Sequence, residues 1–319
     1  MSRSAILLVG GMGTRLHPLT LNTPKPMLPV AGVPFTAHQI AKAKAAGITE
    51  IVLATAFKAE IFRPYFGDGE KFGIEIKYAV EESALGTGGA IRNAADQLKG
   101  TGPVAIFNGD VLTGHDLDGQ FRFHEKNGAD VSLYLTQVPD ARAFGAVELD
   151  NDFRVKAFNE KMENPPTNII NAGCYIFNRE IISQIPSGKV VSVERETFPQ
   201  LLNSGAKVFG FIDTSYWLDI GTPAALLKAS QDLLSGAINS SATPKVSGNY
   251  LALDGAVIAP SAKVGGYSVI GAGAEIGAEA IVEGSVIFDG AKIGSGAQLI
   301  NCFVAPNFQV PAHLVGINN

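Results

Sequence analysis

The chain has 319 residues, enough for one large domain with a smaller one, or for two domains. Its 46% hydrophobic and 17% charged residues are typical of a soluble globular protein. The net charge of −5 argues against broad electrostatic binding to a nucleic acid polymer, because such binding needs a basic face. Any phosphate ligand must therefore be held by a local cluster of residues.

No segment of the sequence predicts export or a membrane span. The apolar run in "MSRSAILLVGG" is too short for a signal peptide, and no later run reaches the ~20 apolar residues that a membrane span needs. Cys174 and Cys302 lie far apart without metal-binding spacing, which favours two reduced packing residues. We expect a cytoplasmic protein that does not bind membranes.

Short β-branched runs alternate with helical patterns through the first two thirds of the chain. The predicted strands are "AILLV" (5–9), "EIVLAT" (50–55), "IEIKYAV" (74–80), "PVAIFNGD" (103–110), "DVSLYLTQ" (130–137), "GAVELD" (145–150), "NAGCYIFN" (171–178) and "AKVFGFI" (206–212). A helix is predicted over 35–47, with Ile40, Ala41 and Ala45 on one side and Gly47 as its stop, and another ends near Gly236. The alternation predicts a βαβ-built, mixed but mainly parallel sheet.

After the polar joint "AINSSATPKVSGN" (237–249), aliphatic residues recur every six positions. The repeat comprises Ile258, Val264, Ile270, Ile276 and Val282, then Ile287, Ile293 and Leu299 after a slip of one residue, and Val304 and Val310 after another. This period predicts a short left-handed β-helix, in which each aliphatic residue points into a triangular prism and small residues turn the corners. Eighteen residues per coil would give about three coils over residues 250–319.

The loop "VGGMGTRLHPLTLNTPKPMLPVAG" (9–32) follows the first predicted strand, where open α/β sheets bind their ligands. It lacks the Gly-Lys-Ser/Thr end of a P-loop, and "GGMGTR" does not match G-x-G-x-x-G. Taken alone, its glycines fit either a tight turn or a phosphate cradle. In a cradle, the N–H groups of Gly10, Gly11 and Gly13 could approach phosphates because no Cβ intervenes.

Together with later segments, this loop resembles the signature of the nucleoside-diphosphate-sugar pyrophosphorylases, also called sugar-1-phosphate nucleotidyltransferases. The matching segments are "GGMGTRLHPLT", "TPKPMLPVAGVP", "ALGTGGA" (84–90), "NGD" (108–110), "FNEK" (158–161), "NAG" (171–173), "SVERETFPQL" (192–201) and "YWLDIGTP" (216–223). The resemblance spans residues 4 to about 235 and is closest to the mannose-1-phosphate guanylyltransferase branch. It implies an α/β, Rossmann-like catalytic domain over 1–236, a linker over 237–249 and the β-helix over 250–319.

The implied reaction is attack by a sugar 1-phosphate oxygen on the α-phosphorus of a nucleoside triphosphate, with pyrophosphate leaving. No general base is needed, because the attacking oxygen is already ionised near neutral pH. The obstacle is repulsion between substrates that together carry roughly six negative charges. Catalysis should therefore rest on positioning and on charge neutralisation, with a metal bridging phosphate oxygens.

The resemblance assigns roles residue by residue. The catalytic residues are Arg15 for the departing pyrophosphate, Lys25 for the transferring phosphate and Asp110, which shares a Mg²⁺ ion with Asp219. The nucleotide-binding residues are Gly10, Gly11, Gly13, Thr14, Glu81, Gly86 and Thr87. Glu81 aligns with the residue at the base edge, where a carboxylate accepts from the N1–H and N2–H₂ donors of guanine. An amide would match uracil or thymine better.

For the sugar phosphate, Gly145, Glu160, Lys161 and Asn171 fall on the family's positions. Lys161 would contact the phosphate and Glu160 the hydroxyls. Glu194 could be either a helix-start acid or a ligand contact. Two segments depart from the family's usual pattern: "ALGTGGA" replaces the typical "PLGTAG", and "EKM" replaces the frequent "EKP".

The expected substrates are GTP and mannose 1-phosphate, with Mg²⁺ as cofactor and a homo-oligomer as the assembled form. The departures leave open a uridylyl- or thymidylyltransferase acting on glucose 1-phosphate, N-acetylmuramic acid 1-phosphate or a related sugar phosphate. A catalytically silent regulatory homologue is less favoured, because Arg15, Lys25, Asp110 and Asp219 are all present. An acyltransferase tail is disfavoured, because its one histidine, His313, lies beyond the last regular repeat.

Overall fold

The computed structural model describes residues 3–11, 13–55, 59–246 and 248–317, and it divides the chain into two compact units. Unit 1 comprises Met1–Met12, Pro24–Pro26 and Gln39–Trp217, and unit 2 comprises Gly13–Thr23, Met27–His38 and Leu218–Asn319. Residues 1–2 and 318–319, the ends of the predicted domains, lie outside the described residues. The domain boundaries themselves were drawn from sequence patterns and stay predictions.

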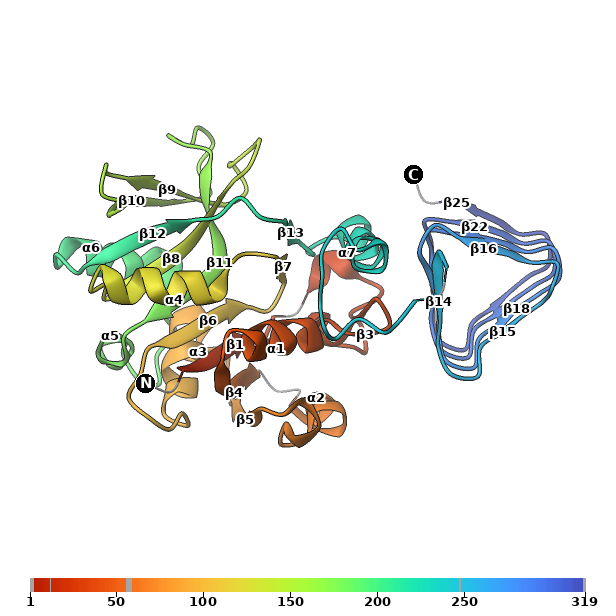
Figure 1. Cartoon of the computed structure of the whole chain (residues 1–319), viewed down its shortest axis with the longest axis horizontal. Coiled ribbons are helices and arrows are strands. Elements are labelled where there is room, and N and C mark those ends of the chain that lie inside the picture. Colours follow the sequence, from red (N-terminus) through yellow and green to blue (C-terminus); the bar gives the residue numbers. More distant parts are fainter. Residues whose placement is uncertain (1–2, 12, 56–58, 247, 318–319) are drawn as a thin grey trace. The chain divides into compact units, whose positions relative to one another are not determined.

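Unit 1 is built on one nine-stranded mixed sheet (Figure 1). Its strands are β1 (Arg3–Leu8), β4 (Ile48–Thr55), β5 (Glu75–Val80), β6 (Val104–Asn108), β8 (Val131–Gln137), β9 (Gly145–Leu149), β10 (Val155–Glu160), β11 (Ile169–Phe177) and β12 (Val208–Ile212). The strand order is β10-β9-β11-β6-β1-β4-β5, and the four strands from β6 to β5 are parallel. Strand β8 lies off this path and pairs with β11 on one side and with the parallel strand β12 on the other. Strand β11 runs antiparallel to β6, β8 and β9, so the expected mixed sheet with a parallel part is confirmed.

The central strands are apolar on both faces, as expected for parallel strands covered by helices. In β1 the residues from Ser4 to Leu7 are all buried, and in β4 so are Glu50 to Thr55. Strand β10 was not predicted as a strand. It pairs only with β9, and it is mostly half-buried and rich in polar residues, so it lacks the apolar run that marks the inner strands.

The helices and short elements complete both units. The helices are α1 (Phe35–Ala45), α2 (Ala59–Phe66), α3 (Gly86–Ala95), α4 (Leu117–Lys126), α5 (Arg179–Ser183), α6 (Phe198–Asn203) and α7 (Pro223–Ser235). The short elements are η1 (Thr14–Leu16), η2 (Lys25–Met27), η3 (Glu70–Phe72), the π-helical η4 (Val193–Thr197), β2 (Pro29–Val30), β3 (Val33–Pro34), β7 (Val111–Thr113) and β13 (Trp217–Asp219). Helix α3 packs against β1, β4 and β5, and α4 against β8, β11 and β12.

The predicted helix over 35–47 forms, but its buried stripe differs from the expected one. Ala37, Ile40 and Ala43 are at most 2% exposed, whereas Ala45 is exposed and Ala41 half-buried. An i, i+3, i+6 spacing stays on one helical face, and in this alanine-rich segment the sequence offers several equivalent stripes. The expected stripe of Ile40, Ala41 and Ala45 was therefore wrong in all but Ile40.

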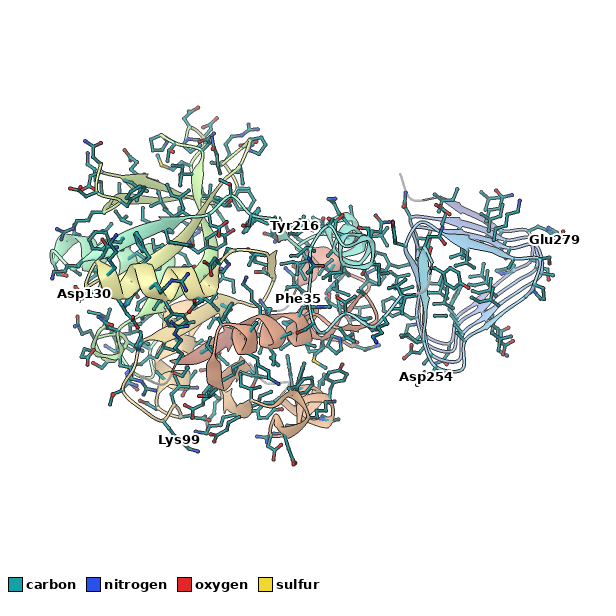
Figure 2. The ribbon with its side chains drawn as sticks, viewed as in Figure 1. Phe35, Lys99, Asp130, Tyr216, Asp254 and Glu279 are labelled. Atoms are coloured by element: carbon teal, nitrogen blue, oxygen red, sulfur yellow. The ribbon has the colours of Figure 1, made fainter. Side chains whose placement is uncertain are left out.

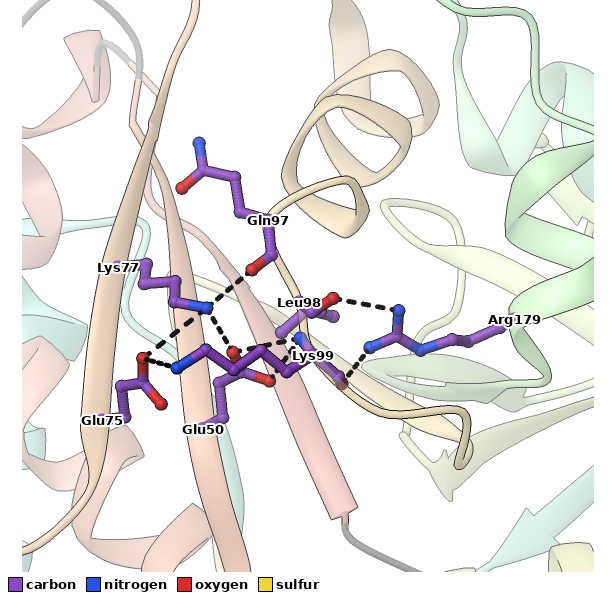
Figure 3. A network of polar contacts seen from close by, with 7 residues as sticks. All are labelled: Glu50, Glu75, Lys77, Gln97, Leu98, Lys99 and Arg179. Carbon is purple, nitrogen blue, oxygen red and sulfur yellow. Dashed lines mark hydrogen bonds and ion pairs between the residues drawn. The ribbon is translucent and has the colours of Figure 1, made fainter.

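A polar network fixes the loop that leads from α3 into β6, at the end of the sheet where β4 and β5 begin (Figure 3). Glu50, only 6% exposed, accepts hydrogen bonds from Lys77 Nζ at 2.6 Å and from the backbone N–H of Lys99 at 2.9 Å. Arg179 donates to the carbonyl oxygens of Leu98 and Lys99 at 3.3 and 2.7 Å. The loop after α3 is thereby tied to β4 by Glu50 and to α5 by Arg179.

The tail of unit 2 is a three-sided β-helix, seen end-on as a triangle in Figure 1. Its three sheets each contain four strands, all paired in parallel. The first is β14 (Tyr250–Ala252), β17 (Ser268–Ile270), β20 (Val286–Ile287) and β23 (Phe303–Val304); the second is β15 (Val257–Ile258), β18 (Glu275–Ile276), β21 (Lys292–Ile293) and β24 (Gln309–Val310); the third is β16 (Lys263–Gly265), β19 (Ile281–Glu283), β22 (Gln298–Ile300) and β25 (Val315–Ile317). Figure 2 shows side chains filling the interior of this triangle, with Glu279 on an outer corner.

The predicted inward residues form the core of this β-helix. From Ile270 to Val310 every member of the repeat is at most 5% exposed, and Ile258 and Val264 pack against them. The number of coils differs from the expected three, because each sheet has four strands. Ala252 precedes Ile258 by six residues and Gly316 follows Val310 by six, and strand pairing places both in register with inward positions. A search for aliphatic repeats misses both end strands, because Ala and Gly carry no such signal.

Glycine follows four of the inward residues, and at Gly271 and Gly277 the backbone of the next coil lies too close for a side chain. A Cβ on Gly271 would lie 2.5 Å from Asp289 N, and one on Gly277 would lie 2.7 Å from Ile293 O. Both distances are shorter than van der Waals contact, so successive coils could not keep this spacing with a side chain at either position.

Within the part of the chain that the structure describes, no helix is both long and apolar enough to cross a bilayer.

Replacing Glu50 with Ala should destabilise unit 1, because it leaves the Lys99 N–H and the Lys77 ammonium without the nearly buried carboxylate that accepts from both. We expect a loss of about 1–3 kcal/mol, seen as a lower urea midpoint in the fluorescence of Trp217, the chain's one tryptophan and a member of unit 1. Glu75→Ala is the matched control: Glu75 contacts the Lys77 and Lys99 side chains from an exposed position and should matter much less. Equal shifts for the two variants would contradict the assigned role of Glu50.

Candidate active site

A cavity of about 350 Å³ lies at the carboxyl ends of the parallel strands of unit 1. Its lining residues are Leu8, Gly10, Gly11, Lys25, Pro26, Ala54, Glu81, Ala84, Gly86, Thr87, Ala90, Asn108, Gly109 and Asp110. Leu8 and Asn108 end β1 and β6, Ala54 is the penultimate residue of β4, and Glu81 directly follows β5. Four parallel strands therefore converge on the cavity, which is the expected place for a ligand in an open α/β sheet.

An ion pair between Lys25 and Asp110 forms one wall of the cavity. The two atoms Lys25 Nζ and Asp110 Oδ2 are 2.9 Å apart, and the side chains are 8% and 38% exposed. An ammonium group buried to this degree needs a partner of opposite charge. Lys25 opens the short helix η2 between two prolines, so its backbone is held in place by a stiff segment.

Asp110 reaches the cavity because the chain turns sharply just before it. Gly109 N donates to the Leu8 carbonyl oxygen at 3.0 Å, and a Cβ on Gly109 would lie 2.2 Å from that oxygen. Only glycine fits this close approach between the ends of β1 and β6. At Gly11, by contrast, no described residue beyond its chain neighbours lies within 4 Å of where a Cβ would stand.

Glu81 is an acid buried in the cavity wall. It is 8% exposed, and its Oε2 accepts a hydrogen bond from Leu85 N at 2.9 Å. Burial raises the pKa of Glu81, and the bond from Leu85 opposes that shift more weakly. The carboxyl group is therefore oriented by the loop that follows it, as a base-reading group would have to be.

The glycines of "ALGTGGA" make room for a distant segment. Gly88 N and Gly89 N, in the first turn of α3, donate to the Val191 carbonyl oxygen at 2.8 and 3.3 Å, and Val191 N donates to Leu85 O at 2.9 Å. A Cβ on Gly88 would lie 2.9 Å from Val191 Cγ1, and one on Gly89 would lie 2.5 Å from Lys189 O. Gly88, which stands where the family typically has Ala, thus accommodates Val191.

Three of the four predicted sugar-phosphate residues lie together at one end of the β9–β10 pair. Gly145 pairs directly with Glu160, and a Cβ on Gly145 would lie 2.9 Å from Glu160 Oε2. Lys161, whose side chain is 59% exposed, places Nζ 3.6 Å from Glu160 Oε1. The fourth, Asn171, lies on β11 and donates from Nδ2 to the Tyr175 hydroxyl at 2.8 Å. None of the four is among the residues that line the cavity.

The remaining predicted residues belong to unit 2. Gly13 has φ +61° and precedes the short helix η1, in which Thr14 and Arg15 are the first two residues. Asp219 Oδ1 accepts from Gly221 N at 2.7 Å, and a Cβ on Gly221 would lie 2.7 Å from both Arg15 Nη2 and Asp219 Oδ1. The structure therefore brings Arg15 and Asp219 together around a glycine.

Asp110 is suited to hold a cation, because a cationic group already faces it at 2.9 Å. In the described residues, no three His, Cys, Asp or Glu side chains form a ready cluster for a metal. Mg²⁺ does not require one, since it is commonly held by one or two carboxylates together with substrate phosphates and water. The donors at the cavity fit that kind of site.

Sequence reasoning did not identify Tyr175 or Val191. Tyr175 is fully buried, and burial raises the pKa of its hydroxyl well above 10. Its sequence signal is weak, because an aromatic residue in an apolar strand predicts only core packing. Val191 acts through backbone atoms, which no residue pattern reveals.

Comparison with known proteins agrees with this geometry. The model of a family described as "Nucleotidyl transferase" matches residues 4–236, and the model "GlmU-like, C-terminal hexapeptide" matches residues 242–319. The chain is 50% identical over 270 residues to a protein of Mycobacterium tuberculosis named "Mannose-1-phosphate guanylyltransferase", covering 84% of this chain and 75% of that protein.

Two solved structures share the fold over about three quarters of this chain. HddC from Yersinia pseudotuberculosis complexed with GMP-PN superposes with a TM-score of 0.61 at 29% identity, covering 73% of this chain and 99% of that one. A putative glucose-1-phosphate thymidylyltransferase from Bacillus anthracis in complex with a sucrose gives a TM-score of 0.67 at 24% identity, covering 76% of this chain and 98% of that one. At 24% identity, the similarity to the Bacillus anthracis structure shows a shared fold and nothing more.

The raised pKa of Glu81 predicts a pH-dependent cost to stability. An acid whose pKa is raised by folding is stabilised in its neutral form, so this contribution is present below the unfolded pKa and is lost as the pH rises through the folded pKa. Glu81→Gln replaces the acid by a neutral amide and so removes this loss of stability at high pH. We expect it to raise the melting temperature over wild type at pH 7.5 and to leave it unchanged near about pH 4.

Glu82→Gln is the control, because Glu82 is the exposed neighbour of Glu81. It should leave the melting temperature unchanged at both pH values. A Glu81→Gln effect of the same size at the two pH values would mean that Glu81 is not a buried acid with a raised pKa.

Proposed function

The chain belongs to the nucleotidyl transferase family, and from that premise we propose that it transfers a guanylyl group from GTP to mannose 1-phosphate, giving GDP-mannose and pyrophosphate. The observation that carries this proposal is the cavity that holds a buried carboxyl group, Glu81, together with the Lys25–Asp110 ion pair. A relative with half of its aligned residues identical bears the name of this activity, which supports the same conclusion.

Charge neutralisation is the main task of the proposed mechanism. Lys25 is nearly buried and already paired with an anionic oxygen, so a phosphate oxygen could replace Asp110 as its partner. Arg15 offers a planar guanidinium for the pyrophosphate that leaves. These groups need no proton transfer, because the attacking phosphate oxygen is ionised, and their positive charges offset the repulsion between the substrates.

We propose Asp110 and Asp219 as the protein ligands of Mg²⁺, which would supply positive charge against the phosphates of the substrates. The chain's own contribution is to hold Asp110 at the cavity wall through the Gly109 turn, and Asp219 through the hydrogen bond from Gly221 N. Both carboxylates are thus oriented by backbone N–H groups or close backbone approaches.

Base recognition is assigned to Glu81 and to the loop after it. A carboxylate can accept from both N1–H and N2–H₂ of guanine, whereas the corresponding edge of uracil has only one donor. The backbone around Gly10, Gly11, Gly13 and Thr14 is proposed to contact the triphosphate, and Gly86 and Thr87 to contact the nucleoside.

Sugar recognition is assigned to the β9–β10 end and to β11. Glu160 would accept from sugar hydroxyls, and Lys161, which is mostly exposed and 3.6 Å from Glu160, would pair with the sugar phosphate. Gly145 leaves the space beside Glu160 free of a side chain. Asn171 offers an amide on the neighbouring strand. The cytoplasmic location and the homo-oligomeric state stay predictions.

A substrate panel tests the proposed reaction directly. Pyrophosphate release would be measured for GTP, UTP, dTTP, ATP and CTP, each with mannose 1-phosphate, glucose 1-phosphate and N-acetylmuramic acid 1-phosphate, with MgCl₂ present. We expect the highest kcat/KM for GTP with mannose 1-phosphate. A higher kcat/KM with UTP or dTTP would assign the chain to the uridylyl- or thymidylyltransferases, and no turnover with any pair would remove the enzymatic proposal.

Base selectivity should depend on the Glu81 carboxylate. Glu81→Gln replaces an acceptor by a donor at one of the two guanine contacts, so we expect kcat/KM with GTP to fall about 100-fold, as the loss of one charge-assisted hydrogen bond implies. Relative activity with UTP or dTTP should rise. Glu82→Gln should leave both unchanged. An unaltered preference for GTP in Glu81→Gln would show that another group reads the base.

A further inference from the structure

The segment Lys189–Glu194 is hydrogen-bonded to residues 85–89. Two of these residues line the part of the cavity wall that is proposed to bind the nucleotide, here called the nucleotide side. Three backbone hydrogen bonds join Val191 to Leu85 and to the first turn of α3, and Val193 N donates to Thr87 Oγ1 at 2.9 Å. The segment then enters the π-helical turn η4, a rare geometry that is frequent at functional sites. The Thr87 side chain is therefore fixed by hydrogen bonding to a segment about a hundred residues later in the chain.

The Glu194 carboxylate connects this loop to the buried face of β11. Its Oε2 accepts from Thr87 Oγ1 at 2.8 Å and from Ser192 Oγ at 3.1 Å, and its Oε1 accepts from the Tyr175 hydroxyl at 3.5 Å. An ionised carboxylate can only accept hydrogen bonds. All three hydroxyl groups therefore direct their protons at Glu194.

The proton direction fixes what the Tyr175 hydroxyl can do on its other side. Having donated its one proton to Glu194, it can only accept, and it does so from Asn171 Nδ2 at 2.8 Å. Asn171 Oδ1 in turn accepts from Gly173 N at 3.2 Å. The orientation of the Asn171 amide is thus set by a chain of hydrogen bonds that begins at Glu194.

Two polar groups at this chain of hydrogen bonds are weakly paired or unpaired among the described residues. The Tyr175–Glu194 contact of 3.5 Å is at the long end of the range for a hydrogen bond. The buried Asn108 Oδ1, in a residue that lines the cavity, has no hydrogen-bond partner among the described residues. Buried polar groups are normally paired, so a small shift that shortened the first contact or supplied a donor to the second would be favourable.

We propose that Glu194 is a positioning residue that, through Tyr175, couples the nucleotide side of the site to the sugar side. A nucleotide that orders Thr87 orders Glu194, Tyr175 and then Asn171, and a sugar 1-phosphate bound at Asn171 acts in the reverse direction. This inference rests on the proposed function, since it takes the two ligands from it. Coupling between two bound ligands is reciprocal, so either ligand can serve as the probe.

The experiment measures the affinity for mannose 1-phosphate by calorimetry, with MgCl₂, in the absence and in the presence of saturating α,β-methylene-GTP, whose carbon bridge prevents transfer. The ratio of the two dissociation constants is the coupling factor. Direct repulsion between the ligands also enters this ratio, but it does not involve Tyr175 and is the same in every variant. If the substrate panel selects another pair, that pair replaces these ligands, so a wrong base or sugar overturns the proposed function without overturning the coupling.

Tyr175→Phe removes only the hydroxyl and keeps the packing of the ring against Phe177 and Phe198. We expect it to lower the coupling factor about 5-fold or more, the lower end for coupled sites. Glu194→Gln should do the same, because its amide would donate where the carboxylate accepted. The double variant should lower the factor no further, since both changes break one connection.

Glu196→Gln is the matched control. Glu196 lies in the same π-helical turn, is exposed, and accepts only from Ser192 N, at 2.8 Å, so it should leave the coupling factor unchanged. If Tyr175→Phe and Glu194→Gln lower the melting temperature or both affinities but leave the ratio at the wild-type value, the network is structural and the proposal is overturned. Additive effects of the two changes, or an equal effect of Glu196→Gln, would overturn it as well.

Discussion

The ion pair between Lys25 and Asp110 is the interaction on which the candidate site depends. A nearly buried ammonium group is tolerated only beside an anion, so Lys25 requires Asp110 at the end of β6. Asp110 in turn reaches that place only because Gly109 passes within 3.0 Å of the Leu8 carbonyl oxygen. In the proposed reaction each member of the pair would exchange its partner. Lys25 would pair with a substrate phosphate in place of Asp110, and Asp110 would bind a cation in place of the Lys25 ammonium.

A second constraint is that α3 is held at both ends. Its first turn donates to Val191 and lines the cavity, while the loop after its last turn is tied down by Glu50 and Arg179. Thr87 lies in that first turn, and its hydroxyl group donates to the Glu194 carboxylate at 2.8 Å. A single carboxylate can therefore link the two substrate sides in the coupling that we propose.

The sequence was sufficient for the features that depend on local pattern. The parallel strands, the long helices and the inward residues from Ile258 to Val310 follow from periodicity, and the motifs place Lys25, Asp110 and Glu81 at one cavity. Contacts between distant segments could not be predicted in this way. Gly88 departs from the alanine that the family typically has in this loop. The reason is Val191, about a hundred residues later in the chain, which packs against Gly88. The two end strands, β14 and β25, were missed because Ala252 and Gly316 offer no large aliphatic side chain at the inward position.

The central claim is that substrate and Mg²⁺ separate the Lys25–Asp110 pair, and a crystal structure of the chain with MgCl₂ and α,β-methylene-GTP tests it most directly. The quantity to measure is the distance between Lys25 Nζ and Asp110 Oδ2, which is 2.9 Å without ligands. We expect it to exceed hydrogen-bonding range, with Lys25 contacting a phosphate oxygen and Asp110 contacting the metal. A pair that stays intact beside a fully bound nucleotide and metal would contradict the account.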